Sequence, residues 1–238
     1  MILFIKLLLA HLLGDFIWQP NSWVADKEVK KHKSIYLYLH ILLHGILAAL
    51  LAGEIQFIPY AILIAVTHGA IDLIKLNFQK STTKRTWFVV DQIVHILILI
   101  GIVFLYKNKT MELLWFGNQF WILITGLLFI TKPTSIFIKT IISIWSPEES
   151  NSHIDNSLAS AGNYIGILER LFVFGFILTG HFEAIGFLLA AKSIFRFGDL
   201  KEAKDRKLTE YVLIGTLISF GTAILTGLIV QALLLQLL

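Results

Sequence analysis

The stretch TWFVVDQIVHILILIGIVFLY, residues 86–106, decides the fold class. It is long enough to cross a bilayer as a helix, because a hydrocarbon core of about 30 Å needs about 20 apolar residues at about 1.5 Å each. Comparable runs occupy residues 2–19, 35–53, 57–79, 111–130, 163–180, 184–198 and 208–237. The sequence therefore predicts an all-α fold, a polytopic transmembrane helix bundle with about eight membrane helices.

Composition supports a membrane class and excludes others. Of the 238 residues, 56% are hydrophobic and only 15% are charged, whereas a soluble domain carries about 25% charged residues. The formal charge of +4 does not indicate a nucleic-acid partner, because the basic residues lie between the apolar runs. Cysteine is absent, which excludes disulfides and thiolate metal sites.

The chain is predicted to have two halves. A five-helix half covers residues 1–145 and ends in a short interfacial helix at 134–145, after Pro133. The polar, turn-rich linker SPEESNSHIDNSLASAG, residues 146–162, precedes a three-helix half at 163–238.

Basic residues predict the orientation. The stretches 20–34, 75–85, 132–139 and 196–207, which all fall on one side of the predicted bundle, hold 15 of the 20 lysines and arginines. Positive charge marks the cytoplasmic side. We therefore expect a multi-pass protein of the inner (plasma) membrane with both termini outside.

Four of the predicted helices each carry one pair of ligand-type residues. Every pair has the spacing i, i+4, which puts both side chains on one helix face. Every pair also lies near the cytoplasmic end of its helix, so antiparallel helices would bring all of them to one level. The pairs are His11 and Asp15, His40 and His44, His68 and Asp72, and Asp91 and His95.

Burying such polar side chains in lipid costs free energy. One bound cation could interact with several of them at once and offset that cost. Imidazole with carboxylate, without thiolate, favours one or two divalent transition metals such as Zn, Mn or Fe. Asp15 and Asp91 are candidate general bases for a metal-activated water. The alternatives are hydrogen bonds between helices and a proton relay.

A second group of charges lies at the same depth in the C-terminal half. It predicts either an ion-pair network, with Glu169 paired to Lys192 and Glu210 to Arg196, or a site for an anionic headgroup. The group comprises Glu169, Arg170, Lys192, Arg196 and Glu210.

Seven segments resemble one family of bacterial inner-membrane proteins, classed as domain of unknown function 3307. They are HLLGDFIWQ at 11–19, HILLH at 40–44, HGAID at 68–72, DQIVH at 91–95, IGILER at 165–170, AIGFLLAAKSIFRF at 184–197 and EYVLIGTLIS at 210–219. The resemblance supports the membrane class and implies no reaction. Gln19, Lys75 and Asn77 are further residues that we expect to line the site.

The residues favour a membrane-embedded metal-dependent hydrolase. Its substrate would be amphiphilic or lipid-linked and anionic, its partners would be membrane lipids, and it would work at the cytoplasmic leaflet. The alternatives are a proton- or metal-coupled transporter, a di-iron lipid oxidoreductase and a non-catalytic structural subunit.

Overall fold

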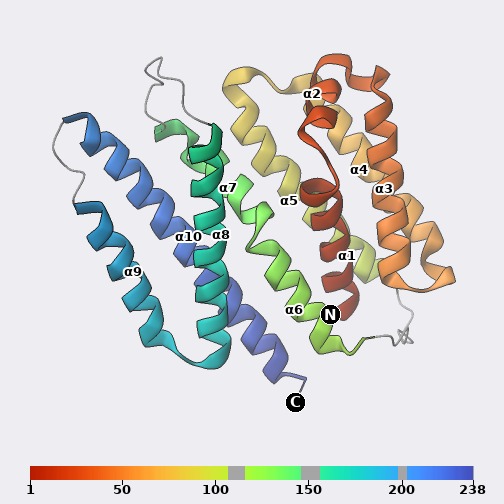
Figure 1. The fold of residues 1–238 in the computed structure, drawn as a ribbon. Coiled ribbons are helices and arrows are strands. Elements are labelled where there is room, and N and C mark those ends of the chain that lie inside the picture. Colours follow the sequence, from red (N-terminus) through yellow and green to blue (C-terminus); the bar gives the residue numbers. More distant parts are fainter. Residues whose placement is uncertain (107–115, 146–155, 198–202, 238) are drawn as a thin grey trace. The chain divides into compact units, whose positions relative to one another are not determined.

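A computed structural model describes residues 1–106, 116–145, 156–197 and 203–237, and within these ranges the chain is helical without strands (Figure 1). The chain divides into two compact units, Met1–Thr125 and Gly126–Leu238. The division falls within a helix, earlier than the linker predicted at 146–162. Residues 146–155 of that linker lie outside the described ranges.

Four long helices form the framework of the first unit, and shorter turns join them. Helix α1 packs against α3 and α5, and α4 packs against α3 and α5, so the four close into a ring. The elements are α1 (Ile2–Leu12), η1 (Leu13–Ile17), α2 (Asn21–Lys30), η2 (Lys31–Lys33), α3 (Ile35–Ala52), η3 (Ile55–Phe57), α4 (Ile58–Phe78), η4 (Ser81–Thr83), α5 (Lys84–Leu105) and the start of α6 (Asn118–Phe129).

Local sequence explains where these helices begin and end. Gly53 ends α3 with a left-handed φ of 78° and donates its N–H to the Ala49 carbonyl, a conformation that glycine adopts at little cost. Proline stands in the first turn of α4, where its missing N–H leaves no bond unmade.

The first helix does not continue straight through its predicted span. After α1 the backbone widens into a π-helical turn, η1, in which the Trp18 N–H bonds to the Leu13 carbonyl. Pro20 then redirects the chain, and α2 with η2 is bent by 82° from α1 and η1. Residues 20–34, which lie between two predicted membrane helices, are therefore largely helical.

An apolar core fills the end of the first unit remote from α2. It contains large side chains that are almost fully buried, such as Leu7 from α1, Ile64 from α4 and Leu99 from α5. Alanines of α3, Ala48 and Ala52, allow the helices to approach closely. The next level along the same helices carries the histidines and aspartates.

The second unit contains a broken helix. Its elements are the end of α6, α7 (Lys132–Ile142), η5 (Ser143–Trp145), α8 (Asn156–Thr179), α9 (Phe182–Phe197) and α10 (Ala203–Leu235). Pro133 lacks the N–H that would continue α6 into α7, and the Thr134 hydroxyl donates to the released Phe129 carbonyl at 2.7 Å. Helices α7 and α8 both pack against α10.

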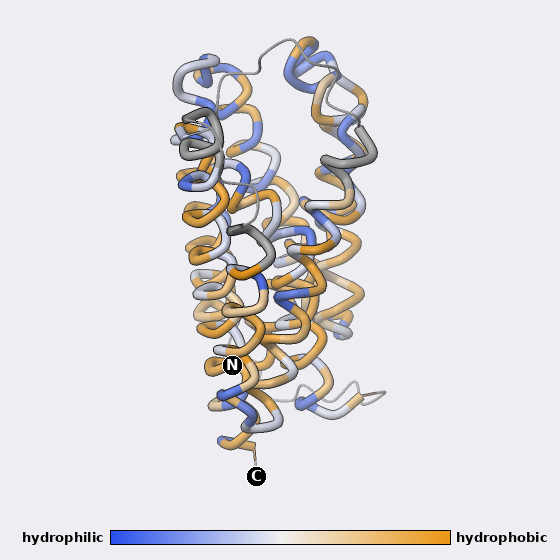
Figure 2. The backbone as a smooth tube through the Cα atoms, turned by 60° about the vertical axis from the view of Figure 1, so that its left-hand side comes forward, coloured by the Kyte–Doolittle hydropathy of each residue, from blue (hydrophilic) through white to orange (hydrophobic). Residues whose placement is uncertain are grey.

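Six helical stretches among the described residues are long and apolar enough to cross a membrane, or up to seven if the bent pair of residues 2–17 and 21–33 counts as one. Hydrophobic residues predominate along them (Figure 2). The predicted number of eight is not confirmed. Helix α9 has 16 residues, about 24 Å of helix, which is shorter than a bilayer core of about 30 Å. Residues 118–145 together form one candidate span by length and composition, in which α6 and α7 are separate helices.

Candidate metal centre

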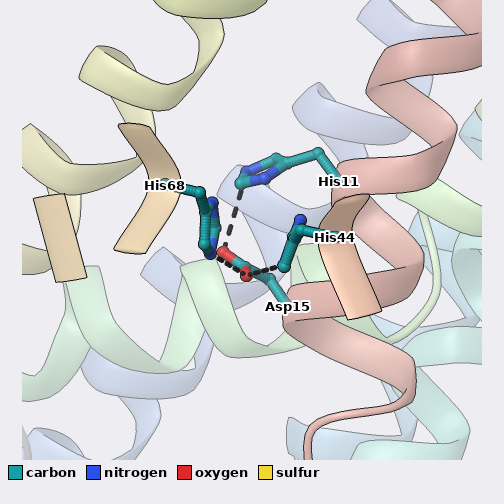
Figure 3. Close-up of side chains that lie close together, drawn as sticks. All are labelled: His11, Asp15, His44 and His68. Carbon is teal, nitrogen blue, oxygen red and sulfur yellow. Dashed lines mark hydrogen bonds and ion pairs between the residues drawn. The ribbon is translucent and has the colours of Figure 1, made fainter. Parts of the chain in front are cut away.

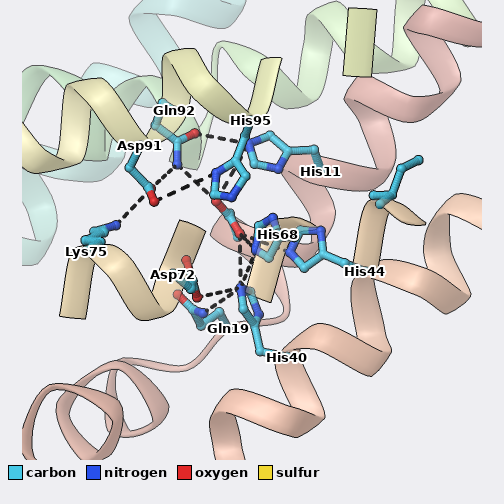
Figure 4. A network of polar contacts seen from close by, with 12 residues as sticks. His11, Gln19, His40, His44, His68, Asp72, Lys75, Asp91, Gln92 and His95 are labelled. Carbon is cyan, nitrogen blue, oxygen red and sulfur yellow. Dashed lines mark hydrogen bonds and ion pairs between the residues drawn. The ribbon is translucent and has the colours of Figure 1, made fainter. Parts of the chain in front are cut away.

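Eight histidine and aspartate side chains meet at one level of the first unit. Elements α1 and η1 supply one pair, and α3, α4 and α5 supply one pair each (Figure 4). Seven of the eight are buried, and the Asp15 side chain is 11% exposed. The structure thus brings together all the residues of the four predicted pairs: His11, Asp15, His40, His44, His68, Asp72, Asp91 and His95.

The carboxylate of Asp15 lies at the centre of this group. Its Oδ1 atom is 3.0 Å from His44 Nε2, 3.2 Å from His40 Nε2 and 3.4 Å from His68 Nε2. Its Oδ2 atom is 3.7 Å from His11 Nε2. In Figure 3 the rings of His11, His44 and His68 converge on this carboxylate from separate helices. Four imidazoles thus present the same ring nitrogen to one carboxylate.

The π-helical turn η1 and Gly14 allow this approach. Asp15 lies inside the turn, and π-helical turns are rare and frequently occur at functional sites. A Cβ atom on Gly14 would lie 2.5 Å from both Nε2 and Cε1 of His44, closer than atoms tolerate. Only glycine at position 14 therefore lets the His44 ring reach Asp15.

The ring nitrogens are more crowded than hydrogen bonding alone explains. His40 Nε2 lies 3.0 Å from His68 Nε2 and 3.1 Å from the Gln19 amide nitrogen, as well as close to Asp15. A neutral imidazole nitrogen either donates one hydrogen bond or accepts one, so a single tautomer does not satisfy all three neighbours. A shared cation would satisfy adjacent nitrogen lone pairs.

Other atoms of the group have no hydrogen-bond partner among the described residues. His95 is 3% exposed, and neither of its ring nitrogens has a partner. His40 Nδ1 and Asp91 Oδ1 are also buried without one. Buried polar atoms are nearly always paired, and a bound ion or water is a recognised reason for an exception. These atoms point to a missing ligand.

Three overlapping sets of side chains bring their ligand atoms within 4.8 Å of one another. The first set has three imidazoles and one carboxylate, and the third has one imidazole and two carboxylates. His68 belongs to the first two sets, and Asp15 belongs to the first and third. The sets are His11, Asp15, His44 and His68; His40, His68 and Asp72; and Asp15, Asp91 and His95.

Two lysines neutralise the outer carboxylates. Lys27 Nζ donates to Asp72 Oδ2 and Lys75 Nζ donates to Asp91 Oδ2, both at 2.8 Å. Asp15 has no ion pair with lysine or arginine among the residues described. It accepts a hydrogen bond from the Gln92 amide at 3.0 Å instead. Asp15 therefore remains the carboxylate that the imidazoles surround.

Two cavities adjoin the group on different sides. A cavity of about 10 Å³, enough for roughly one water, lies between the imidazoles and the apolar core, beside Thr67 and Leu99. A larger cavity of about 60 Å³ lies on the side of α2 and is lined by Asp15, His40, Asp72 and both lysines. The larger cavity thus adjoins both the group and the two lysines.

Sequence reasoning missed Lys27, Gln92 and Gly14. The sequence indicates Lys27 only as one of the basic residues that set topology. Nothing in the sequence shows that α2 folds back toward Asp72. Gln92 adjoins Asp91, and its polarity within an apolar run was the available signal. Of the three extra residues that were predicted, Gln19 and Lys75 line the larger cavity, whereas Asn77 is exposed.

The C-terminal charges make internal contacts in the second unit. Lys192 Nζ donates to Glu169 Oε2 at 2.6 Å, which confirms that predicted pair. Arg170 is 3% exposed and donates to the Ile130 and Thr131 carbonyls and to the hydroxyls of Ser135 and Ser219. The Arg170 guanidinium therefore binds two carbonyls at the helix break, and that of Thr131 also accepts the Ser135 N–H. The Arg196 side chain lies outside the described part of the structure, and Glu210 is exposed.

Comparison with known proteins places the chain in a family. No curated protein and no solved structure shows significant similarity to it. One family matches residues 3–124, which include all four His/Asp pairs and both lysines. The chain belongs to the family described as Protein of unknown function (DUF3307).

Proposed function

We propose that the protein is a metal-dependent hydrolase embedded in the bacterial inner membrane. It acts at the cytoplasmic leaflet on an amphiphilic or lipid-linked anionic substrate. One observation carries the proposal: four imidazole Nε2 atoms lie 3.0–3.7 Å from the carboxylate of Asp15, at a depth where uncompensated polar groups are expensive. Soft thiolate ligands are absent, so the donor set suits Zn, Mn or Fe.

The donor chemistry favours two ions over one or three. An imidazole nitrogen has one lone pair, so His68 Nε2 serves a single ion, and the first and second ligand sets exclude each other. A carboxylate has two oxygens and bridges two ions readily. Asp15 would bridge an ion in the first set and an ion held by Asp91 and His95 in the third. Bridged two-metal sites are common in hydrolases of phosphate esters.

In this assignment Asp15 and Asp91 are ligands rather than general bases. The metals would supply an activated water. His40, left outside both ion sites, lines the larger cavity and lies 3.2 Å from Asp15. His40 Nε2 would accept the proton of the attacking water, in place of the hydrogen bond of 3.1 Å that it accepts from the Gln19 amide.

The surroundings of the centre favour chemistry over transport. The larger cavity adjoins α2 and its basic residues, which we assign to the cytoplasmic side. On the other side, Leu7, Ile64 and Leu99 belong to an apolar core at the far end of the unit, next to the cavity of about 10 Å³. A substrate that approaches from the cytoplasmic side would reach the metals without crossing the bundle.

A metal- or proton-coupled transporter is the second candidate. The observation in its favour is the 82° bend between η1 and α2 beside the group, because broken helices form the ion sites of many transporters. A transporter needs the apolar core to open, so proteoliposomes would show metal flux without any hydrolysed product.

Elemental analysis of the detergent-purified protein tests the proposal. We expect about two divalent ions per chain, and release of product from a lipid phosphate ester in the same preparation. Asp15→Asn should lose both ions, and Asp72→Asn, the matched control, should keep them. A wild-type protein that is active without bound metal would overturn the metal assignment.

A further inference from the structure

We propose that Lys27 and Lys75 form a subsite for the phosphate group of the substrate, beside the metal centre. This inference rests on the proposed function and names the substrate class of the same site. Both lysines line the cavity of about 60 Å³, together with the centre's residues Asp15, His40 and Asp72. They reach it from α2 and α4, which are separated in the sequence.

The two ammonium groups are held in fixed positions. Lys27 is 5% exposed although it lies on a short helix that is otherwise mostly exposed. Its Nζ atom and that of Lys75 each use one donor on an aspartate, at 2.8 Å. An ammonium group has three donors, so each lysine retains donors for a second, anionic partner.

The charge of the pocket supports an anion once metal is bound. The centre has three carboxylates, those of Asp15, Asp72 and Asp91, and two lysines. With neutral imidazoles this group therefore carries one surplus negative charge. Glu28 also lines the cavity, but it is paired with Lys84 at 2.5 Å. Two divalent cations would turn the one negative charge into three surplus positive charges, which favours a phosphate dianion over a singly charged carboxylate.

The cavity has the size for such a group. One water occupies about 10–15 Å³ of cavity volume on the same measure. A cavity of about 60 Å³ therefore has room for roughly four waters. A phosphate group has four oxygens, so it would fill a similar space. Gln79 also lines this cavity, and its Oε1 atom is buried without a hydrogen-bond partner in the described part of the chain.

The contacts favour an anion site at Lys27 and Lys75 over the site predicted at the C-terminal charges. Within the described residues, the Arg170 guanidinium donates hydrogen bonds to carbonyls and hydroxyls of its own unit. Lys192 is paired with Glu169. By contrast, Lys27 and Lys75 share a cavity with Asp15, the residue common to both proposed ion sites.

Titration calorimetry of the metal-loaded, full-length protein with inorganic phosphate tests this inference. Lys27→Met and Lys75→Met should each raise the Kd for phosphate at least about tenfold, since each removes a charge-assisted contact. Lys192→Met removes an equally ion-paired lysine from the other unit, and should leave the Kd within about twofold of the wild type.

A double variant separates anion binding from simple charge balance. Lys27→Met with Asp72→Asn removes both members of the ion pair and so preserves the net charge and the fold. If Lys27 contacts phosphate directly, the double variant stays weak. If the double variant binds phosphate like the wild type, Lys27 only neutralises Asp72 and the inference is wrong.

Metal content, measured on the same samples, distinguishes the two proposals. A wild type that holds metal but does not bind phosphate defeats the subsite alone. A wild type without metal defeats the proposed function and the subsite with it.

Competition by short-chain phosphatidic acid, with phosphatidylcholine of equal chain length as the control, separates a lipid phosphate from free phosphate. Stronger competition by phosphatidic acid supports a lipid source, and equal or no competition supports a soluble phosphate ester.

Discussion

Replacing Gly14 with alanine would test whether the approach of His44 to Asp15 builds the centre. The new Cβ atom would lie 2.5 Å from His44 Nε2 and Cε1, whereas ordinary contacts begin at 3.4 Å. The ring would therefore retreat by about 0.9 Å, the difference between those two distances. Metal–ligand distances tolerate only about 0.2 Å. We expect His44 to leave the first ion site.

The expected loss of metal affinity is at least about 10–100-fold, the range seen even for outer partners of a ligand. Overpacking should lower the free energy of unfolding by only about 1–3 kcal/mol, so the fold should survive. The assay is metal content after competition with a chelator, followed by elemental analysis. Gly101→Ala is the matched control, because nothing lies within 4 Å of a Cβ atom at that position. Equal metal retention by the two variants would refute the reasoning.

Three further substitutions have separable outcomes. His68→Ala should lower bound metal at least about tenfold while His32→Ala, at an exposed site, leaves it unchanged; equal metal contents would contradict the ligand assignment. Arg170→Lys should lower the free energy of unfolding by about 2–4 kcal/mol, because bonds to the carbonyls at the helix break are lost; circular dichroism in detergent measures this, and an unchanged Tm would exclude the role. Lys192→Met should lower the free energy of unfolding by about 1–3 kcal/mol, because it leaves the buried Glu169 carboxylate unpaired. Adding Glu169→Gln should recover much of this loss in the same assay, and no recovery would show that the pair does not stabilise the unit.

The sequence predicted the helical class and the common level of the His/Asp pairs. Both follow from local patterns, namely the long apolar runs and the i, i+4 spacing. A spacing of four residues places two side chains on one helix face whatever the neighbouring helices do. Four antiparallel apolar runs then leave few ways to arrange the pairs. The eight residues therefore converge without further information from the chain.

Features that depend on a bend were not predictable in this way. A proline at position 20 indicates that the first helix ends there. Only the structure shows that the chain bends by 82° into α2 and places Lys27 against Asp72. Arg170 presents the opposite case. Its charge and depth suggested a headgroup site, whereas its partners include the carbonyls of Ile130 and Thr131 at the helix break, 40 and 39 residues away in the sequence.

The unequal ends of the first unit have a kinetic consequence. Because packed leucine and isoleucine side chains close one end and the cavity lies on the other, whatever reaches the centre would leave by the path it used to arrive. Product would then have to leave the cavity before the next substrate enters, and both molecules would belong to the same leaflet.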